Sequence, residues 1–339
     1  MKLTEKQTKS RDLFIQKINS GVYDMQKNPC ICGKNDDIAI ASKDRYQIPI
    51  NTVLCKNCAL MRSDPYYTPK TLEEFYSNEY RELYGSNEIS KESFFAEQQS
   101  FGMYIYDFLK ENILKNEIQN KKIYEIGCGA GGILNFFKKN NNEVYGCDLG
   151  KNYIEYGITK GLKNLIVGTS KDLKQFGQAD IIILNHVLEH LLDPIGELET
   201  IRTLLKEDGV LYIGVPGIYS IHSTYTDLES FLQNAHVYHF TLKTLTTLAE
   251  KVGFELIYGN ETIQSAFKKN PSISSITKEK SIDVENYLRK IKRYKYIYKI
   301  KKISPKTIAI NSIMKLAKKN EKAYNFGKKF YRKYILKEK

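Results

Sequence analysis

The 339-residue sequence lacks any apolar run near the roughly 18 residues that a bilayer-spanning helix requires. Residues 1–20 are charged throughout and contain no apolar segment of the kind that marks a signal peptide. Internal repeats and low-complexity segments are also missing. These absences favour a cytoplasmic protein, and its length is ample to bury a hydrophobic core.

Most of the chain lacks a net positive charge, although the formal net charge of the whole sequence is +13. Residues 281–339 hold 19 lysines and arginines against 4 acidic residues, whereas residues 1–280 hold 33 against 35. A neutral body argues against a nucleic-acid-binding face spread over it, so nucleic acid is not an expected partner. The basic tail interleaves lysines with Tyr, Ile and Phe. This pattern suits a helix on an anionic membrane surface, a single-stranded nucleic-acid contact, or a helix packed on a partner subunit.

A glycine cluster after a short apolar strand predicts a nucleotide-cofactor site. Four glycines follow the strand expected at residues 122–126, namely Gly127, Gly129, Gly131 and Gly132. They let the backbone turn sharply and approach a ligand closely, while the helix expected over residues 133–140 points its partly positive N-terminus at the same place. Asp148 ends the next expected strand, about one βαβ unit later, where its carboxylate can accept both hydroxyls of a ribose.

Glycine spacing alone fits two cofactor classes, because Gly127, Gly129 and Gly132 also satisfy the dinucleotide pattern. Glu125 separates them, since a carboxylate at this strand end would repel a pyrophosphate and attract a cationic amino-acid group. The stretch Glu125-Ile-Gly-Cys-Gly-Ala-Gly resembles motif I of class I S-adenosylmethionine-dependent methyltransferases. That resemblance implies that Glu125, Gly127 and Gly129 hold the methionine part of S-adenosylmethionine and that Asp148 holds the ribose. A dinucleotide-dependent oxidoreductase is the rival.

Two further segments resemble the same family. Ser170 lies in the loop after the third expected strand, where the family contacts adenine; Thr169 is the alternative, because the acidic residue often found there is absent. Asn185 and His186 follow the apolar strand 179–184, at the strand end where open α/β sheets bind ligands. We assign Asn185 to the cofactor and His186 to the acceptor.

The segment after this strand also excludes a rival. Asn185-His186-Val187-Leu188 differs from the Asn/Asp-Pro-Pro-aromatic loop with which amino-methylating nucleic-acid enzymes hold a flipped base. It continues as Val-Leu-Glu-His-Leu, which closely resembles the family. Glu189 and His190 are expected to pack or to hydrogen-bond locally.

Two histidines precede the last expected helix, in the segment His236-Val-Tyr-His239-Phe. In the resembled family such a segment lies beside the substrate pocket. His236 is a candidate general base, because histidine has the side-chain pKa nearest neutrality. His239 is expected to tie the loop to the backbone. Residues 218–233, which come before them, are polar, aromatic and aperiodic, as in a lid over an active site.

Two cysteine pairs near the N-terminus predict a zinc knuckle. Cys30 and Cys32 form the first pair, and Cys55 and Cys58 form the second. Four thiolates at about 2.3 Å satisfy tetrahedral Zn²⁺, and the cytoplasm keeps thiols reduced. The first pair has one intervening residue where two are usual, so two separate thiol pairs or a lost site remain alternatives.

The cysteine-bearing segment over residues 28–85 resembles the one that precedes the catalytic domain in bacterial sugar and surface-glycan methyltransferases. The resemblance implies an α/β fold with a seven-stranded Rossmann-like sheet, a small N-terminal zinc module and a basic helical C-terminal extension. We expect domains at residues 1–90, 91–260 and 261–339, with residues 262–280 as a polar linker. The substrate would be a sugar of a surface polysaccharide or its nucleotide-linked precursor, and the tail would contact the inner face of the cell membrane. The alternatives are a small-molecule methyltransferase of quinone or secondary metabolism and a zinc-knuckle RNA-binding adaptor.

Overall fold

A computed structural model describes residues 3–84, 90–116, 118–225, 227–270 and 279–302. The chain forms two compact units, residues 1–287 and 288–339. The basic tail begins with helix α11 (Ser281–Lys302), as predicted, and its remainder lies outside the described residues. None of the described helices is long and apolar enough to cross a bilayer.

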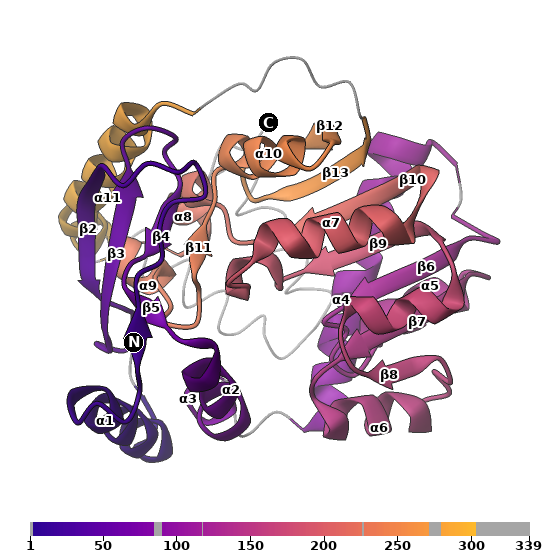
Figure 1. The fold of residues 1–339 in the computed structure, drawn as a ribbon, viewed down its shortest axis with the longest axis horizontal. Coiled ribbons are helices and arrows are strands. Elements are labelled where there is room, and N and C mark those ends of the chain that lie inside the picture. Colours follow the sequence, from indigo (N-terminus) through magenta and orange to yellow (C-terminus); the bar gives the residue numbers. More distant parts are fainter. Residues whose placement is uncertain (1–2, 85–89, 117, 226, 271–278, 303–339) are drawn as a thin grey trace. The chain divides into compact units, whose positions relative to one another are not determined.

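A seven-stranded sheet organises the first unit (Figure 1) and confirms the predicted fold class. Its strand order is β12-β13-β10-β9-β6-β7-β8. The strands are β6 (Lys122–Ile126), β7 (Glu143–Asp148), β8 (Leu165–Val167), β9 (Ala179–Asn185), β10 (Leu205–Gly214), β12 (Phe254–Gly259) and β13 (Gln264–Lys269). β13 runs antiparallel to both neighbours, and the ladders from β10 through β8 are parallel. The carboxyl ends of the parallel strands therefore share one edge.

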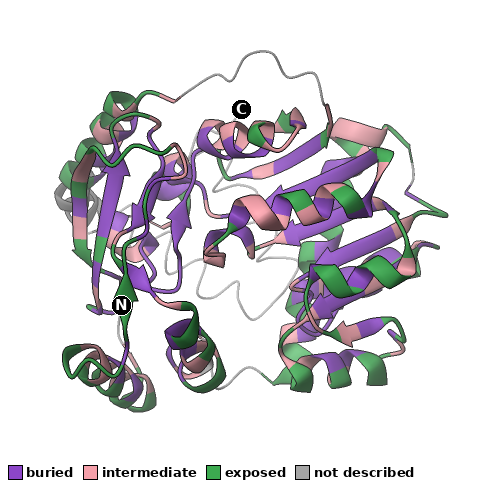
Figure 2. Ribbon diagram, viewed as in Figure 1, coloured by how far each residue is buried: buried purple, intermediate pink, exposed green. Residues whose placement is uncertain are grey.

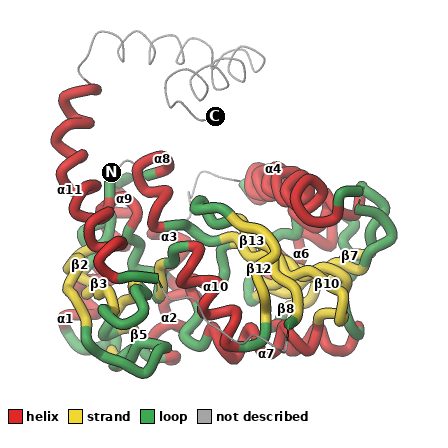
Figure 3. The backbone as a smooth tube through the Cα atoms, turned by 90° about the horizontal axis from the view of Figure 1, so that it is seen from above, coloured by secondary structure: helices red, strands yellow, loops and turns green. Residues whose placement is uncertain are grey.

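Helices cover both faces of the sheet. Side chains of β9 alternate between two cores, with Ile181 and Ile183 in one and Ile182 and Leu184 in the other. The first core includes residues of α4 (Lys91–Leu109), α5 (Gly132–Lys139) and α6 (Lys151–Thr159), and the second includes α7 (Pro194–Leu204) and α10 (Leu242–Lys251). Figure 3 shows α4 and α7 on opposite sides of the sheet. Burial on both faces explains the continuous apolar run of β9, and Figure 2 shows the central strands buried beneath partly exposed helices.

The N-terminal module, residues 3–84, forms a second sheet with a strand from far along the chain. The order is β11-β4-β3-β2, in which Tyr238 of β11 lies opposite Arg62 of β4. The elements are α1 (Glu5–Asn19), β1 (Met25–Gln26), β2 (Asp37–Lys43), β3 (Pro49–Cys55), β4 (Met61–Ser63), β5 (Tyr66–Tyr67), α2 (Pro69–Asn78), α3 (Tyr80–Leu83) and β11 (Tyr238–His239). The short strands β1 and β5 pair with each other. The module and the segment before α10 are thus parts of one folded layer.

The predicted lid at residues 218–233 contains short helices rather than an irregular loop. They are a 3₁₀ turn over Ile218–Ser220, α8 (Ile221–Thr224) and α9 (Leu228–Phe231). Each is too short to show a helical hydrophobic period in the sequence.

The expectation of a polar linker at residues 262–280 is wrong in its first half, because β13 occupies Gln264–Lys269 between β10 and β12. Its buried residues are Ser265, Ala266 and Phe267. A strand that pairs on both edges is stabilised by hydrogen bonds to both neighbours, so it can form with small side chains. The sequence of β13 therefore contains no apolar run that would predict a strand. The domain boundaries at residues 90 and 260 remain predictions.

Candidate active site

The glycine loop between β6 and α5 has the backbone that its sequence predicts. Gly127, Gly129 and Gly131 have φ angles of +69°, +53° and +77°, which disfavour residues with a Cβ. A Cβ on Gly127 would also lie 2.4 Å from a methyl carbon of Val187, and one on Gly132 would lie 2.3 Å from the carbonyl oxygen of Phe95. The loop is therefore enclosed by α4 on one side and by the segment after β9 on the other.

The two acidic residues assigned to the cofactor lie at the ends of adjacent strands. Asp148 accepts hydrogen bonds from the amides of Gly129, at 2.9 Å, and Gly150, at 2.6 Å. Glu125 is 2% exposed, and one of its carboxylate oxygens has no hydrogen-bond partner among the described residues. Burial and then the charge of Asp148 raise the pKa of Glu125 well above its usual value, while a hydrogen bond from the Leu134 backbone opposes the shift. An unsatisfied buried carboxylate beside the glycine loop suits a cationic amino group.

Gln98 of α4 holds the glycine loop, and sequence reasoning missed it. Its amide nitrogen donates to the carbonyl of Cys128 at 3.0 Å, and its oxygen accepts from the amides of Ala130, at 3.2 Å, and Gly132, at 3.3 Å. The side chain is 8% exposed. The only sign of this role in the sequence is that Gln98 is a polar residue among the apolar positions of an amphipathic helix. That pattern does not identify the distant segment that Gln98 contacts.

The other two cofactor candidates lie in different surroundings. Ser170 is buried, and its hydroxyl lies close enough to the Glu197 carboxylate to lower that group's pKa, although burial raises it more. Asn185 is half-buried at the end of β9, where its side-chain oxygen lies over Gly214. Beside Asp148 the loop exposes Leu149, and the end of β8 exposes Val167.

His186 occupies a strained position after β9 and is held by a buried carboxylate. Its φ angle is +56°, uncommon for a residue other than glycine, and its amide donates to the Gly214 carbonyl at 2.8 Å. Its Nδ1 lies 3.2 Å from Oε1 of Glu189, and the imidazole is 49% exposed. Partial desolvation lowers the pKa of His186, but the hydrogen bond and charge of Glu189 outweigh it and raise the pKa.

His236 joins this group from the segment that precedes β11. One ligand atom each from Glu189, His190 and His236 lie within 4.8 Å of one another. The His190 and His236 rings meet edge to face with centroids 4.8 Å apart. Burial, followed by the neighbouring histidines, lowers the pKa of His236 well below its usual value. The structure therefore brings both predicted catalytic histidines to one cluster, through Glu189.

Glu189 forms the predicted local hydrogen bond, with His186, whereas the His190 ring contacts Ala235 and Tyr76, which are distant in sequence. Glu189, His190, His236 and the adjoining His186 are called the histidine cluster below. His239 is buried next to His236, and burial lowers its pKa to about 3. The Nδ1 atom of His239 has no hydrogen-bond partner among the described residues, so the expected link from that atom to the backbone is not present.

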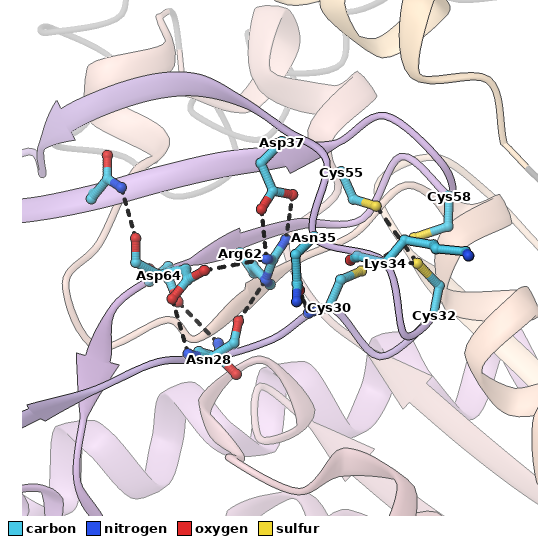
Figure 4. Close-up of polar contacts among 12 residues, drawn as sticks. Asn28, Cys30, Cys32, Lys34, Asn35, Asp37, Cys55, Cys58, Arg62 and Asp64 are labelled. Atoms are coloured by element: carbon cyan, nitrogen blue, oxygen red, sulfur yellow. Dashed lines mark hydrogen bonds and ion pairs between the residues drawn. The ribbon is translucent and has the colours of Figure 1, made fainter.

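The four cysteines of the module come together in one cluster (Figure 4). The Sγ atoms of Cys30 and Cys58 are 3.4 Å apart, and those of Cys32 and Cys55 are 3.6 Å apart. Tetrahedral zinc with Zn–S bonds of about 2.3 Å requires sulfur separations of about 3.8 Å. Each pair is followed by a residue with positive φ, Gly33 or Ala59, which curls the backbone around the sulfurs. The single-residue spacing of the first pair is thus compatible with a tetrahedral metal ion.

Comparison with known proteins agrees with this geometry. Residues 99–258 match a family model described as a methyltransferase domain. A ubiquinone biosynthesis O-methyltransferase of Pelagibacter ubique is 28% identical over 119 residues, which are 31% of this chain and 50% of that protein. A tRNA U34 carboxymethyltransferase of Campylobacter jejuni is 25% identical over 205 residues, which are 53% of this chain and 69% of that protein. The chain thus spans about half the length of the first of these relatives.

A solved structure of a Burkholderia thailandensis 1,6-didemethyltoxoflavin-N1-methyltransferase aligns with 55% of this chain and 92% of its own, at 14% identity and a TM-score of 0.37. The family match, the strand order, the glycine loop and the paired acidic residues together identify residues 99–258 as a class I S-adenosylmethionine-dependent methyltransferase domain.

Proposed function

We propose that the protein transfers the methyl group of S-adenosylmethionine to a sugar of a surface polysaccharide or to the nucleotide-linked precursor of that sugar. We favour the nucleotide-linked precursor as the acceptor. The observation that supports this acceptor is the position of Arg45, a cation near the histidine cluster. Its guanidinium carbon lies 5.1 Å from the ring centroids of both Tyr46 and Tyr84. The amide of Arg45 donates to the carbonyl of Leu232 at 3.0 Å, and the adjacent Asp44 accepts from the amide of Asn234 at 3.1 Å, so this turn lies against the segment that leads into His236.

Arg45 forms no ion pair or side-chain hydrogen bond with the described residues, and its Nε is buried. The adjacent Asp44 is not its partner, because that carboxylate accepts from the amides of Tyr46 and Ile48, from the Tyr84 hydroxyl and from the Asn234 amide. An unpaired guanidinium in a half-buried site suits a phosphate or carboxylate of the acceptor. A nucleotide-linked sugar carries such a group, and a neutral quinone ring does not.

The cofactor would lie along the glycine loop. Glu125, Gly127 and Gly129 would hold the methionine part and Asp148 the ribose, with Asn185 and Ser170 on the adenine side. The sulfonium supplies an electrophilic methyl group, so the protein has to align donor and acceptor and exclude water. A hydroxyl or carbon-acid acceptor also releases a proton. His186, half exposed and oriented by Glu189, is better placed to receive it than His236, which is 7% exposed.

Zinc at the four cysteines is part of the proposal, with a structural role. Cys30, Cys32, Cys55 and Cys58 would hold the ion and fix the loops that lead into β2 and out of β3, next to the segment that carries Arg45. We further propose that the basic tail, residues 281–339, binds the inner face of the cell membrane, where lipid-linked glycans are assembled.

The second candidate is methylation of a quinone or another small metabolite. It is favoured by the sequence similarity to ubiquinone biosynthesis O-methyltransferases. The two candidates make opposite predictions for Arg45, since a neutral aromatic acceptor has no anionic group for it to bind.

The first experiment is isothermal titration of the purified protein with S-adenosylhomocysteine, with NADH as the control ligand. We expect micromolar binding of S-adenosylhomocysteine alone, lost in Asp148→Ala and kept in Asp208→Ala, which removes an exposed carboxylate distant from the glycine loop in sequence. Absence of binding would refute the methyltransferase assignment.

The second experiment is an acceptor screen with nucleotide sugars and with quinol analogues. Replacing Arg45 by Met should lower kcat/KM for a nucleotide sugar about 10- to 100-fold, the value of a charge-assisted hydrogen bond of about 1.5–3 kcal/mol, and leave S-adenosylhomocysteine affinity unchanged. Turnover of quinols that does not depend on Arg45 would favour the second candidate.

A further inference from the structure

We propose that Glu189, His190 and His236 bind a divalent transition-metal ion, at a site separate from the four-cysteine cluster. Two imidazoles and one carboxylate from three different positions converge so that one ligand atom of each lies within 4.8 Å of the others. Nitrogen and oxygen donors of this kind suit zinc and its first-row neighbours. The site does not depend on which acceptor the enzyme methylates.

His190 is arranged as a metal ligand usually is. Its Nδ1 lies 3.0 Å from the carbonyl oxygen of Ala235 and 3.0 Å from the Tyr76 hydroxyl. A carbonyl oxygen can only accept, so the proton of the neutral ring belongs on Nδ1, because two lone pairs facing each other at this distance would repel. Nε2 then presents its lone pair toward Glu189, whose Oε1 is 4.0 Å away. A hydrogen bond from the far ring nitrogen that fixes the tautomer is the common outer-shell feature of metal-bound histidine.

The other two ligands carry polar atoms with no partner. Oε2 of Glu189 and Nδ1 of His236 have no hydrogen-bond partner among the described residues. Both residues are more than nine-tenths buried, at 1% and 7% exposed. Buried polar atoms in folded proteins are nearly always satisfied, so two such atoms in one cluster indicate a missing ligand. A cation satisfies a carboxylate oxygen and a ring nitrogen together.

The distances between the three ligand atoms would fit a tetrahedral metal ion if the atoms moved slightly closer together. Bonds of about 2.0–2.2 Å to nitrogen and oxygen place neighbouring ligands of a tetrahedral ion about 3.5 Å apart. The separations here, 4.0 Å for Glu189 with His190 and at most 4.8 Å overall, are larger by about 0.5–1.3 Å. His190 ends a 3₁₀ turn and His236 precedes β11, so both lie in short loops that can adjust.

The position of the site suggests what the ion would do. Three protein ligands leave a tetrahedral ion one open position, as in catalytic rather than structural zinc sites. The cluster follows the carboxyl end of β9, and Val187, two residues before Glu189, lies over Gly127 of the cofactor loop. An ion there would bind an oxygen of the acceptor and make a hydroxyl more acidic before the methyl group arrives.

The test counts metal ions in the tag-free, full-length protein. Samples are dialysed against micromolar Zn²⁺, desalted and measured by inductively coupled plasma mass spectrometry. We expect two zinc ions per chain for the wild type, one for Glu189→Gln and one for His236→Ala. His222→Ala is the matched control and should keep two, since His222 is exposed in α8 and contacts Tyr287 instead of the cluster. One ion in the wild type, or two in both cluster variants, would overturn the proposal.

A second measurement uses the wild type alone and so does not depend on the folding of a variant. Titration with Co²⁺ should show intense thiolate-to-metal bands that saturate at one equivalent, and then weaker bands of a nitrogen- and oxygen-bound ion at the second. A spectrum that stops changing after one equivalent contradicts the site. S-adenosylhomocysteine affinity should be equal in wild type and Glu189→Gln, so failure of this proposal is distinguishable from failure of the proposed function.

Discussion

Arg62 is fully buried, and its replacement tests whether one ion cluster holds the N-terminal module together. Its Nε donates to the carbonyl of Asn28 at 2.7 Å, and its two terminal nitrogens donate to the Asp37 carboxylate at 2.9 Å each. Asp64 accepts a fourth bond at 3.3 Å. These bonds link β4 to the start of β2 and to the segment that leads into Cys30, as Figure 4 shows.

The expected loss of unfolding free energy in Arg62→Met follows from the burial of this side chain. Breaking a buried pair by removing one partner costs about 3–5 kcal/mol, because the other charge stays desolvated. Arg62→Met keeps the apolar stem and therefore removes charge and hydrogen bonds while leaving little cavity. Asp37 and Asp64 keep side-chain exposures of 18% and 23%, so water can partly satisfy them. We therefore expect the lower end, about 3 kcal/mol, or roughly 4–5 °C in the midpoint of thermal unfolding for a unit of this size.

Differential scanning calorimetry of the zinc-loaded protein measures this shift. The matched control is Lys56→Met, which breaks the pair between Lys56 and Asp36 in the same module, where both side chains are largely exposed. It should not move the midpoint measurably. The double variant Arg62→Met with Asp37→Asn should lose less than the sum of the single losses, since neither charge is then left alone.

A midpoint for Arg62→Met equal to that of the Lys56 control would refute the reasoning. It would mean that the carboxylates recover full hydration when the guanidinium is removed. Additive losses in the double variant would equally contradict a direct interaction between Arg62 and Asp37.

Three further predictions concern the glycine loop. Gln98→Ala should weaken S-adenosylhomocysteine binding about tenfold, because three hydrogen bonds that order the loop are lost, and Gln99→Ala, next to it on α4, should not. Gly127→Ala should abolish binding in the same titration, and adding Val187→Ala should not restore it, since the backbone strain at φ +69° persists after the clash is removed. Glu125→Gln should stabilise the protein in calorimetry at pH 8 while weakening the ligand. The folded state holds the Glu125 proton to a higher pH than the unfolded state does, so wild-type stability falls as pH rises above about 4.5. The difference in midpoint should shrink toward pH 4.5, and a difference independent of pH would contradict this account.

Much of the cofactor site was predictable, because its signals are local. Gly127, Gly129 and Asp148 lie within one βαβ unit, where chain direction forces a strand end, a turn and a helix start to meet. The four cysteines were recognisable for the same reason, since each pair lies on one short turn. The sheet itself followed from apolar runs such as β9, which only a strand buried on both faces requires.

On the proposed acceptor side, the sequence predicted His186 and His236 as separate candidates and did not predict Arg45 or the role of Glu189. Arg45 lies in the module, Glu189 follows β9 and His236 precedes β11, so no spacing in the sequence relates them. Their meeting depends on the pairing of β11 with β4, which joins residues about 175 positions apart through a two-residue strand. Such a strand is too short to show a period.

Sequence by itself determined which residues could turn, bind a nucleotide cofactor or hold a metal, because glycine conformation, carboxylate charge and thiol chemistry belong to single residues and short spacings. Tertiary structure decided which of the polar residues share an environment. It put Gln98 on the glycine loop, placed β13 inside a segment that the sequence predicts to be a linker, and gathered two histidines and a buried carboxylate. These are contacts between distant positions, and their energies come from burial and hydrogen bonds that exist only when the chain is folded.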